Sequence, residues 1–174
     1  APMPTGRYAC AAVTLAGRIY AMGGSTGGAN AMTGMFEMFD PEQDSWQTLS
    51  PMPTARGWLA AASLGGRIYA VGGRLADSTA SAAVECFDPG QGRWQAVAPM
   101  QQPRNQLAAV ALDGYLYVTG GSSGRSGMLN TAERYDATSD SWQVVAPMPS
   151  SRKGHGAAAL AGHLYIVGGC EVLD

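Results

Sequence analysis

The chain has 174 residues, with 11 Lys and Arg against 13 Asp and Glu, a formal net charge of −2, and 46% hydrophobic but only 14% charged residues. This composition is too apolar for a disordered chain and too poor in charge for a coiled coil. The weakly acidic balance gives no electrostatic footprint for nucleic acid. No apolar stretch approaches the roughly 20 residues that cross a bilayer, so we expect neither a nucleic-acid nor a membrane partner.

The N-terminal part of the chain reads as four short strands. A small apolar strand is predicted at Ala9–Leu15, and a glycine turn leads to a second strand at Arg18–Met22. A glycine pair ends that strand, and the polar loop Ser25–Gly34 leads to a third strand around Glu37. A fourth strand carries Trp46. Gly and Pro punctuate the segments and helical spacing is absent, so an all-β fold is predicted.

The same marks return about every 48 residues along the rest of the chain. The glycine pairs are Gly23–Gly24, Gly72–Gly73, Gly120–Gly121 and Gly168–Gly169. The third-strand glutamates are Glu37, Glu85 and Glu133, and the fourth-strand tryptophans are Trp46, Trp94 and Trp142. Later first strands are predicted at Ala60–Leu64, Ala108–Leu112 and Ala157–Leu160, and second strands at Arg67–Val71, Tyr115–Thr119 and His163–Val167. A four-stranded antiparallel unit of this period is typical of a β-propeller blade, whose small-residue first strand lines a crowded channel.

The last unit stops early. Its first two strands are present, and the residues Cys170–Asp174 match the third-strand segment Val84–Asp88, which predicts a third strand after a strongly shortened loop.

These marks resemble the kelch family. The resemblance rests on "RIYAMGG", "RIYAVGG", "YLYVTGG" and "HLYIVGG", together with "FDPEQDSW", "FDPGQGRW" and "YDATSDSW". It implies a kelch-type β-propeller of which about 3.5 four-stranded antiparallel blades are seen, as an arc of a six-bladed ring. On this interpretation residues 1–174 are one propeller segment, with units at about 1–50, 51–98, 99–146 and 147–174.

Residues shared by all units are expected to serve packing or turn geometry, since every blade needs them. The glycine pairs are therefore interpreted as backbone devices, and the tyrosines and tryptophans as packing between blades. His155 falls in register with Cys10, Leu59 and Leu107, which predicts a buried histidine with a hydrogen-bond partner. His163 lies beside a turn and is expected to face solvent.

Two sets of residues are candidates for partner contact. An arginine precedes the first strand of every unit, at Arg7, Arg56, Arg104 and Arg152. In kelch adaptors this position lies at the rim of the channel, where a guanidinium suits acidic partners, although internal pairing is an equal alternative. The second set follows the glycine pairs at Ser25, Arg74 and Ser122, in loops that differ between units.

No catalytic constellation is evident. Two histidines in unsuitable positions argue against a metal site, and we expect no cofactor and no enzymatic activity. By resemblance the chain is a protein-interaction module, and substrate recognition for a ubiquitin ligase is one setting. A sialic-acid mutarotase-like enzyme and an actin-binding scaffold are the alternatives.

Further expectations concern partners and location. We expect a protein partner, with an acidic peptide motif as one form of it. The chain has three cysteines without a metal or disulfide pattern, and Ala1–Pro4 lack the features of a signal peptide, so a cytoplasmic location is predicted. An arc of blades leaves open ends, so we expect the ring to be completed by further chain or by self-association.

Overall fold

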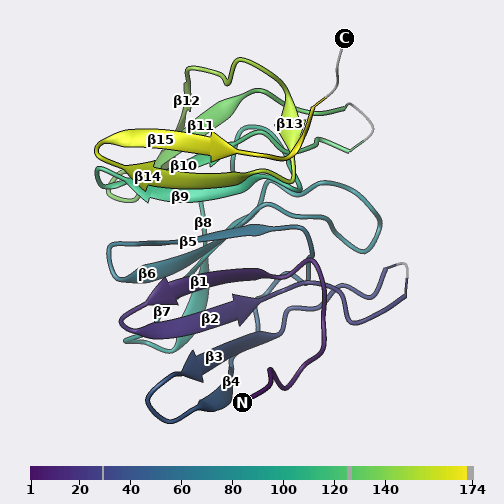
Figure 1. Ribbon diagram of the computed structural model, residues 1–174, viewed down its shortest axis with the longest axis vertical. Coiled ribbons are helices and arrows are strands. Elements are labelled where there is room, and N and C mark those ends of the chain that lie inside the picture. The colour runs from purple at the N-terminus through teal and green to yellow at the C-terminus, as the bar shows by residue number, and fades with distance from the viewer. Residues whose placement is uncertain (29, 125–126, 172–174) are drawn as a thin grey trace.

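The computed structural model describes residues 1–28, 30–124 and 127–171, and every regular element in these ranges is a β-strand (Figure 1). Three antiparallel four-stranded sheets, named blades 1 to 3 here, follow one another along the chain. Blade 1 consists of β1 (Ala11–Leu15), β2 (Arg18–Met22), β3 (Phe36–Asp40) and β4 (Ser45–Leu49). Blade 2 consists of β5 (Ala60–Leu64), β6 (Arg67–Val71), β7 (Val84–Asp88) and β8 (Arg93–Val97). Blade 3 consists of β9 (Ala108–Leu112), β10 (Tyr115–Thr119), β11 (Ala132–Asp136) and β12 (Ser141–Val145).

The prediction of an all-β chain built from four-stranded antiparallel units is confirmed. In each blade the strands pair in chain order, so that the first strand is innermost and the fourth is outermost. None of the described residues forms a helix that is long and apolar enough to cross a membrane.

The innermost strands β1, β5 and β9 lie side by side, and the strand β14 (Gly156–Leu160) follows β9 (Figure 1). Between them lies an open hollow of about 420 Å³. Its lining residues are mostly small: Val13, Ala61, Ala62, Ser63, Ala109, Val110, Ala111 and Ala159. The alanine-rich first strands thus face the space where the channel of a propeller lies, and larger side chains would fill it.

In blades 1 to 3 the glycine pair joins two blades, as Gly72 and Gly73 show. A Cβ on Gly72 would lie 2.5 Å from the carbonyl oxygen of Arg104 in blade 3, and Gly72 has a φ of 59°. A Cβ on Gly73 would lie 2.9 Å from the carbonyl oxygen of Gly57 in its own blade, and Gly73 has a φ of 109°. The absence of a side chain at the first glycine therefore lets the backbone of the next blade come close, and its absence at the second lets the backbone of the same blade come close. This confirms a backbone role for the pair.

Aromatic side chains fill the boundaries between blades. At the first boundary, the ring centroids of Phe87 and Trp94 from blade 2 lie 4.8 Å and 4.9 Å from that of Phe36 in blade 1. At the second boundary, the ring of Tyr135 lies 5.8 Å from that of Tyr69. These rings belong to or pack against the two buried clusters of the core, so the predicted packing role is confirmed at these two boundaries, whereas Tyr165 of the fourth unit is 47% exposed.

The fourth unit departs from the prediction at its end. It forms a two-stranded sheet of β14 and β15 (His163–Val167), and a short pair of β13 (Arg152–Lys153) with β16 (Cys170–Glu171). The predicted third strand at Cys170–Asp174 is wrong for Cys170 and Glu171, and residues 172–174 lie outside the described residues.

Cys170 and Glu171 do not form a third strand because they occupy the position of the residues that directly follow the glycine pair in the other units. Lys153 pairs with Cys170 just as Gly57 pairs with Arg74 directly after its glycine pair. Residues 170 and 171 therefore take the path of the first loop residues after the second strand in the other units. Among the described residues, no third strand pairs with β15.

Candidate partner-binding face

The arginine before each innermost strand is held by the third-strand glutamate of its own blade in blades 1 to 3. Arg56 Nη1 lies 2.9 Å from Glu85 Oε2, and Arg104 Nη2 lies 2.7 Å from Glu133 Oε1. Both arginines are fully buried. The expectation that Arg56 and Arg104 contact a partner directly does not fit this burial, and the structure gives them the alternative role of internal pairing.

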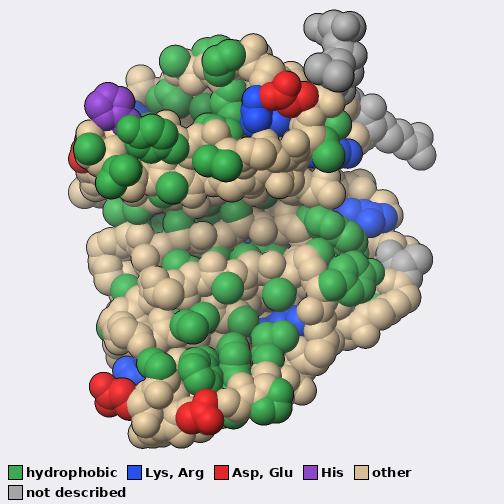
Figure 2. Space-filling view, in the orientation of Figure 1, with side chains coloured by type: hydrophobic (Ala, Val, Ile, Leu, Met, Phe, Trp, Pro, Cys, Tyr) green, Lys and Arg blue, Asp and Glu red, His purple; other side chains and the backbone are tan. Residues whose placement is uncertain are grey.

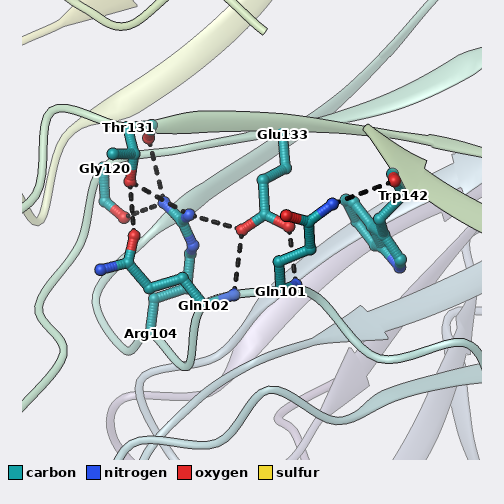
Figure 3. Close-up of polar contacts among 7 residues, drawn as sticks. All are labelled: Gln101, Gln102, Arg104, Gly120, Thr131, Glu133 and Trp142. Carbon is teal, nitrogen blue, oxygen red and sulfur yellow. Dashed lines mark hydrogen bonds and ion pairs between the residues drawn. The ribbon is translucent and has the colours of Figure 1, made fainter. Parts of the chain in front are cut away.

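Figure 3 shows the hydrogen bonds that both terminal nitrogens of the Arg104 guanidinium make, whereas its buried Nε has no partner among the described residues. Its Nη1 donates to the carbonyl oxygens of Gly120 and Thr131 at 2.9 Å and 3.0 Å. The carboxylate of Glu133 also accepts a hydrogen bond from the backbone N–H of Gln101 at 2.7 Å. Burial lowers the pKa of the Arg104 guanidinium, and its pairing with Glu133 offsets part of this effect. The guanidinium stays charged and fixes the segment before β9 to the third strand.

Arg7 and Arg152 differ in exposure. Arg7 Nη2 lies 2.9 Å from Glu37 Oε2, and both side chains are fully buried, so direct contact by Arg7 does not fit either. Arg152 pairs instead with Glu171 of β16, and its side chain is 20% exposed. Of the four arginines, Arg152 is thus the one for which partner contact remains a prediction.

The residues after the glycine pairs lie against the segments before the innermost strands. The backbone bridges are Tyr8 with Ser25, Gly57 with Arg74, and Asn105 with Ser122. Ser25 is fully buried and Ser122 is nearly so, which removes their hydroxyl groups from the surface that we expected them to form. Arg74 is half-buried, and its guanidinium Nη2 donates to Ser78 Oγ at 2.6 Å. Contact by Arg74 remains a prediction.

A line of backbone hydrogen bonds joins the blades next to these bridges. Trp58 N–H donates to the carbonyl of Ala9, Gln106 N–H to that of Trp58, and Gly154 N–H to that of Gln106, each at 2.8 Å. Ala9 has a φ of 53°, Trp58 of 51° and Gln106 of 54°. The first strand begins at Ala11, and the prediction of Ala9 was wrong because a left-handed residue cannot continue a strand.

Three side chains gather on this rim and form what we name the aromatic–arginine cluster: Tyr8, Trp58 and Arg74. The rings of Tyr8 and Trp58 meet edge to face with centroids 5.8 Å apart, and the Arg74 guanidinium lies 5.3 Å from the Trp58 ring centroid. Tyr8 is 51% exposed. Sequence reasoning missed Tyr8 and Trp58. The available signal was that Trp58 lies outside the 48-residue series of tryptophans.

The cluster belongs to the face that carries the loops after β2, β6 and β10, which project together on the right of Figure 1. Figure 2 shows Lys and Arg side chains along this same edge of the molecule. Among residues 1–28, 30–124 and 127–171, no three His, Cys, Asp or Glu side chains come together as a metal site. The face offers cations and aromatic rings, which suit carboxylates and apolar side chains of a polypeptide.

Comparisons with known proteins agree with this architecture. The family model described as the KLHDC2/KLHL20/DRC7 Kelch-repeats domain matches residues 1–171. A solved structure named "Structure of YjhT" superposes with a TM-score of 0.86 and 18% sequence identity over 97% of this chain, and the chain spans 61% of that structure. The search of curated proteins gives no match. The chain therefore belongs to the kelch-repeat family and folds as a segment of a β-propeller.

Proposed function

We propose that the chain is a protein-interaction module that binds its partner through the loop-bearing face, with the aromatic–arginine cluster at the centre of contact. The observation that carries this proposal is a half-exposed cluster of Tyr8, Trp58 and Arg74 that breaks the repeat. Trp, Tyr and Arg are the residue types that dominate binding energy at protein interfaces. Membership of the kelch family supports an interaction role.

The partner is expected to present an acidic segment. Arg74 lies on this face in blade 2, and Lys153 lies in the fourth unit next to Arg152, whose side chain is 20% exposed. A carboxylate can pair with these cations while an apolar side chain packs on Trp58. Such an interface should weaken as the salt concentration rises, because exposed charge pairs are screened.

Affinity capture with quantitative mass spectrometry tests the proposal, and the chain offers a matched control. Arg134 stacks on Tyr115 with its guanidinium 4.5 Å from the ring centroid, at the opposite end of its blade from the loops. We expect Arg74→Ala to reduce capture of the specific partner at least about tenfold, whereas Arg134→Ala leaves it unchanged. Equal capture by both variants contradicts the proposal.

More specifically, we propose that the module selects substrates for a ubiquitin ligase and performs no catalysis itself. The captured partner should then persist longer in cells that carry Arg74→Ala than in cells that carry Arg134→Ala. Acceleration of sialic-acid anomer exchange, measured by NMR, would favour the sugar-active alternative. Co-sedimentation with filamentous actin would favour the scaffold.

A further inference from the structure

The loop that carries Arg74 contains a serine whose backbone conformation is unfavourable for its residue type. The loop closes tightly, because Arg74 bridges Ala80 and Leu75 N–H donates to the carbonyl of Thr79 at 2.9 Å. Ser78 N–H donates to the carbonyl of Leu75 at 3.0 Å, and Ser78 has a φ of 70°. A loop this short needs a left-handed residue before its closing pair, and glycine adopts that conformation without strain.

The loops of the neighbouring blades use glycine for this conformation. Among the described residues of the loops after β2 and β10, beyond their glycine pairs, the left-handed residues are Gly27, Gly28, Gly124 and Gly127. Ser78 therefore keeps a side chain at a kind of position where the other loops have none, at the cost of backbone strain. Such an outlier points to a function of the side chain.

The Ser78 hydroxyl lies between Arg74 and the loop of blade 1. Its Oγ accepts a hydrogen bond from Arg74 Nη2 at 2.6 Å and donates to Asn30 Oδ1 at the longer distance of 3.5 Å. Asp77 Oδ1 accepts hydrogen bonds from the backbone N–H and the hydroxyl of Thr79, at 2.9 Å and 2.6 Å, which fixes the turn around Ser78. The turn thus holds Ser78, and Ser78 in turn holds Arg74.

These contacts give the Arg74 guanidinium one defined place. Its Nη2 is bound to Ser78, and the centroid of the Trp58 ring lies 5.3 Å away. Nη2 is the only nitrogen of this guanidinium with a hydrogen-bond partner among the described residues, so Nε and Nη1 remain for a carboxylate of the partner. An arginine without such support samples many rotamers, and binding then has to immobilise it.

We infer that Ser78 is the positioning residue of the aromatic–arginine cluster: it holds Arg74 beside Trp58 in the orientation in which the cation receives an acidic partner. This inference rests on the proposed function, because it concerns how the same cluster presents its cation. Ser78 acts through Arg74. Because the side chain is ordered before the partner arrives, the bond to Ser78 raises affinity by about threefold to tenfold.

Capture and unfolding of three serine variants separate positioning from folding. Ser78→Gly relieves the left-handed strain and removes the hydroxyl. We expect it to unfold at no lower urea concentration than the wild type, yet to capture about threefold to tenfold less of the proteins whose capture depends on Arg74. Asparagine tolerates the same conformation and offers a side-chain oxygen to Arg74, so Ser78→Asn should restore most of this capture.

The matched control is Ser139→Gly. It removes an exposed hydroxyl that lies 2.8 Å from the hydroxyl of Ser141, in the turn between β11 and β12 at the opposite end of the blade from the loops. Capture by this variant should equal that of the wild type.

NMR of the Arg74 side chain tests the positioning role without any partner. The ring current of Trp58 should shift the Arg74 side-chain protons upfield in the wild type. Ser78→Gly should move these signals toward the values of an exposed arginine, whereas Ser78→Asn and Ser139→Gly should keep them. Unchanged Arg74 signals in Ser78→Gly overturn the inference.

Two further outcomes count against it. Wild-type capture by Ser78→Gly after the Arg74 signals have moved overturns the inference, and so does a loss of capture that accompanies a lower unfolding midpoint, since Ser78 is then merely structural. If Arg74→Ala changes no capture at all, the proposed function fails, and the Arg74 signals alone decide the positioning role.

Discussion

At the scale of single residues, the repeated arginine and glutamate show how a charged pair can be a structural element. The pair between Arg104 and Glu133 lies at a fully buried position, and each charge is surrounded by backbone hydrogen-bonding groups. A buried charge that loses its partner keeps its desolvation penalty without compensation. The pair therefore holds the segment before the innermost strand in place, and its loss should be severe.

Glu133→Gln tests this directly, since glutamine keeps the shape but removes the counter-charge of Arg104. We expect the free energy of unfolding to fall by about 3 kcal/mol or more. The matched control is Asp88→Asn, which affects the exposed Arg67–Asp88 pair and should cost less than about 1 kcal/mol. Urea denaturation measures both, and a loss for Glu133→Gln no larger than the control would contradict the buried-pair interpretation.

His155 makes the last boundary sensitive to pH. It stands where the second and third units have Leu59 and Leu107. It is buried, and its Nε2 lies 2.9 Å from Thr119 Oγ1, which confirms the predicted buried histidine. Burial, with the nearby charge of Arg152, lowers the pKa of His155. Because the unfolded chain then binds the proton more tightly than the folded chain, stability is full above about pH 6.5 and falls as the pH drops below it.

We therefore expect the thermal midpoint of His155→Leu to fall less than that of the wild type between about pH 7.5 and pH 5. His163 is the matched control because it is exposed, as predicted, and its Nδ1 lies 2.8 Å from the carbonyl oxygen of Ala161. His163→Ala should keep the wild-type pH dependence. Differential scanning calorimetry measures the midpoints, and parallel curves for wild type and His155→Leu would rule out this origin.

At the scale of elements, the end of the second strand in blades 1 to 3 sets the distance to the next blade. The N–H of Gly73 donates to the carbonyl of Arg104 in the next blade at 2.9 Å, beside the close approach of Gly72 to that same oxygen. The glycine pair thus ends a strand, lets the backbone of the next blade come close, and donates a hydrogen bond to it. This arrangement explains why the pair returns with every unit.

Gly72→Ala should be strongly destabilising, because its Cβ would lie 2.5 Å from a backbone oxygen that cannot move without the next blade. We expect a loss of about 3 kcal/mol or more. Gly66→Ala is the control, because it introduces the same left-handed backbone strain without a steric clash. Gly66 has a φ of 75° with nothing within 4 Å of its Cβ, so about 1–2 kcal/mol is expected. Similar losses in chemical denaturation would refute the close-approach role.

At the scale of the whole molecule, the blades form an arc whose ends carry complementary backbone groups. Within the described residues, the N–H of Ala9 and the carbonyl of Arg7 make none of the bonds between blades at one end. The carbonyl of Gly154 and the N–H of Gly169 make none at the other. A donor and an acceptor at one end thus match an acceptor and a donor at the other.

The side chains at the two ends also match. Ile19 on blade 1 is 40% exposed, and Tyr165 and Val167 on β15 are 47% and 68% exposed. Their equivalents pack together at the inner boundaries, so we expect the 174-residue chain alone to associate head to tail with a second copy. Sedimentation velocity should show a concentration-dependent species larger than the monomer, reduced by Ile19→Asp. A monodisperse monomer that unfolds cooperatively would contradict this expectation.

The sequence by itself determined the unit of this protein. Glycine pairs, strand-forming segments and tryptophans placed at a constant period specify local hairpins and their packing, because each mark acts within its own blade or on the next one. The strand ranges of the second unit agree with the prediction at both inner strands, Ala60–Leu64 and Arg67–Val71. The buried state of His155 also followed from register alone.

Only the tertiary structure decided which chemical groups reach the surface. The sequence fits Arg56 and Arg104 equally well as partner contacts or as internal pairs. The structure decides for internal pairs, because Glu85 and Glu133, each 29 residues later in the chain, lie beside them in space. Trp58 joins Tyr8 and Arg74 through contacts between two blades, and Cys170 falls in the loop position through its pairing with Lys153. Burial and contact depend on neighbours distant in the chain, whereas periodicity describes each unit and its immediate successor.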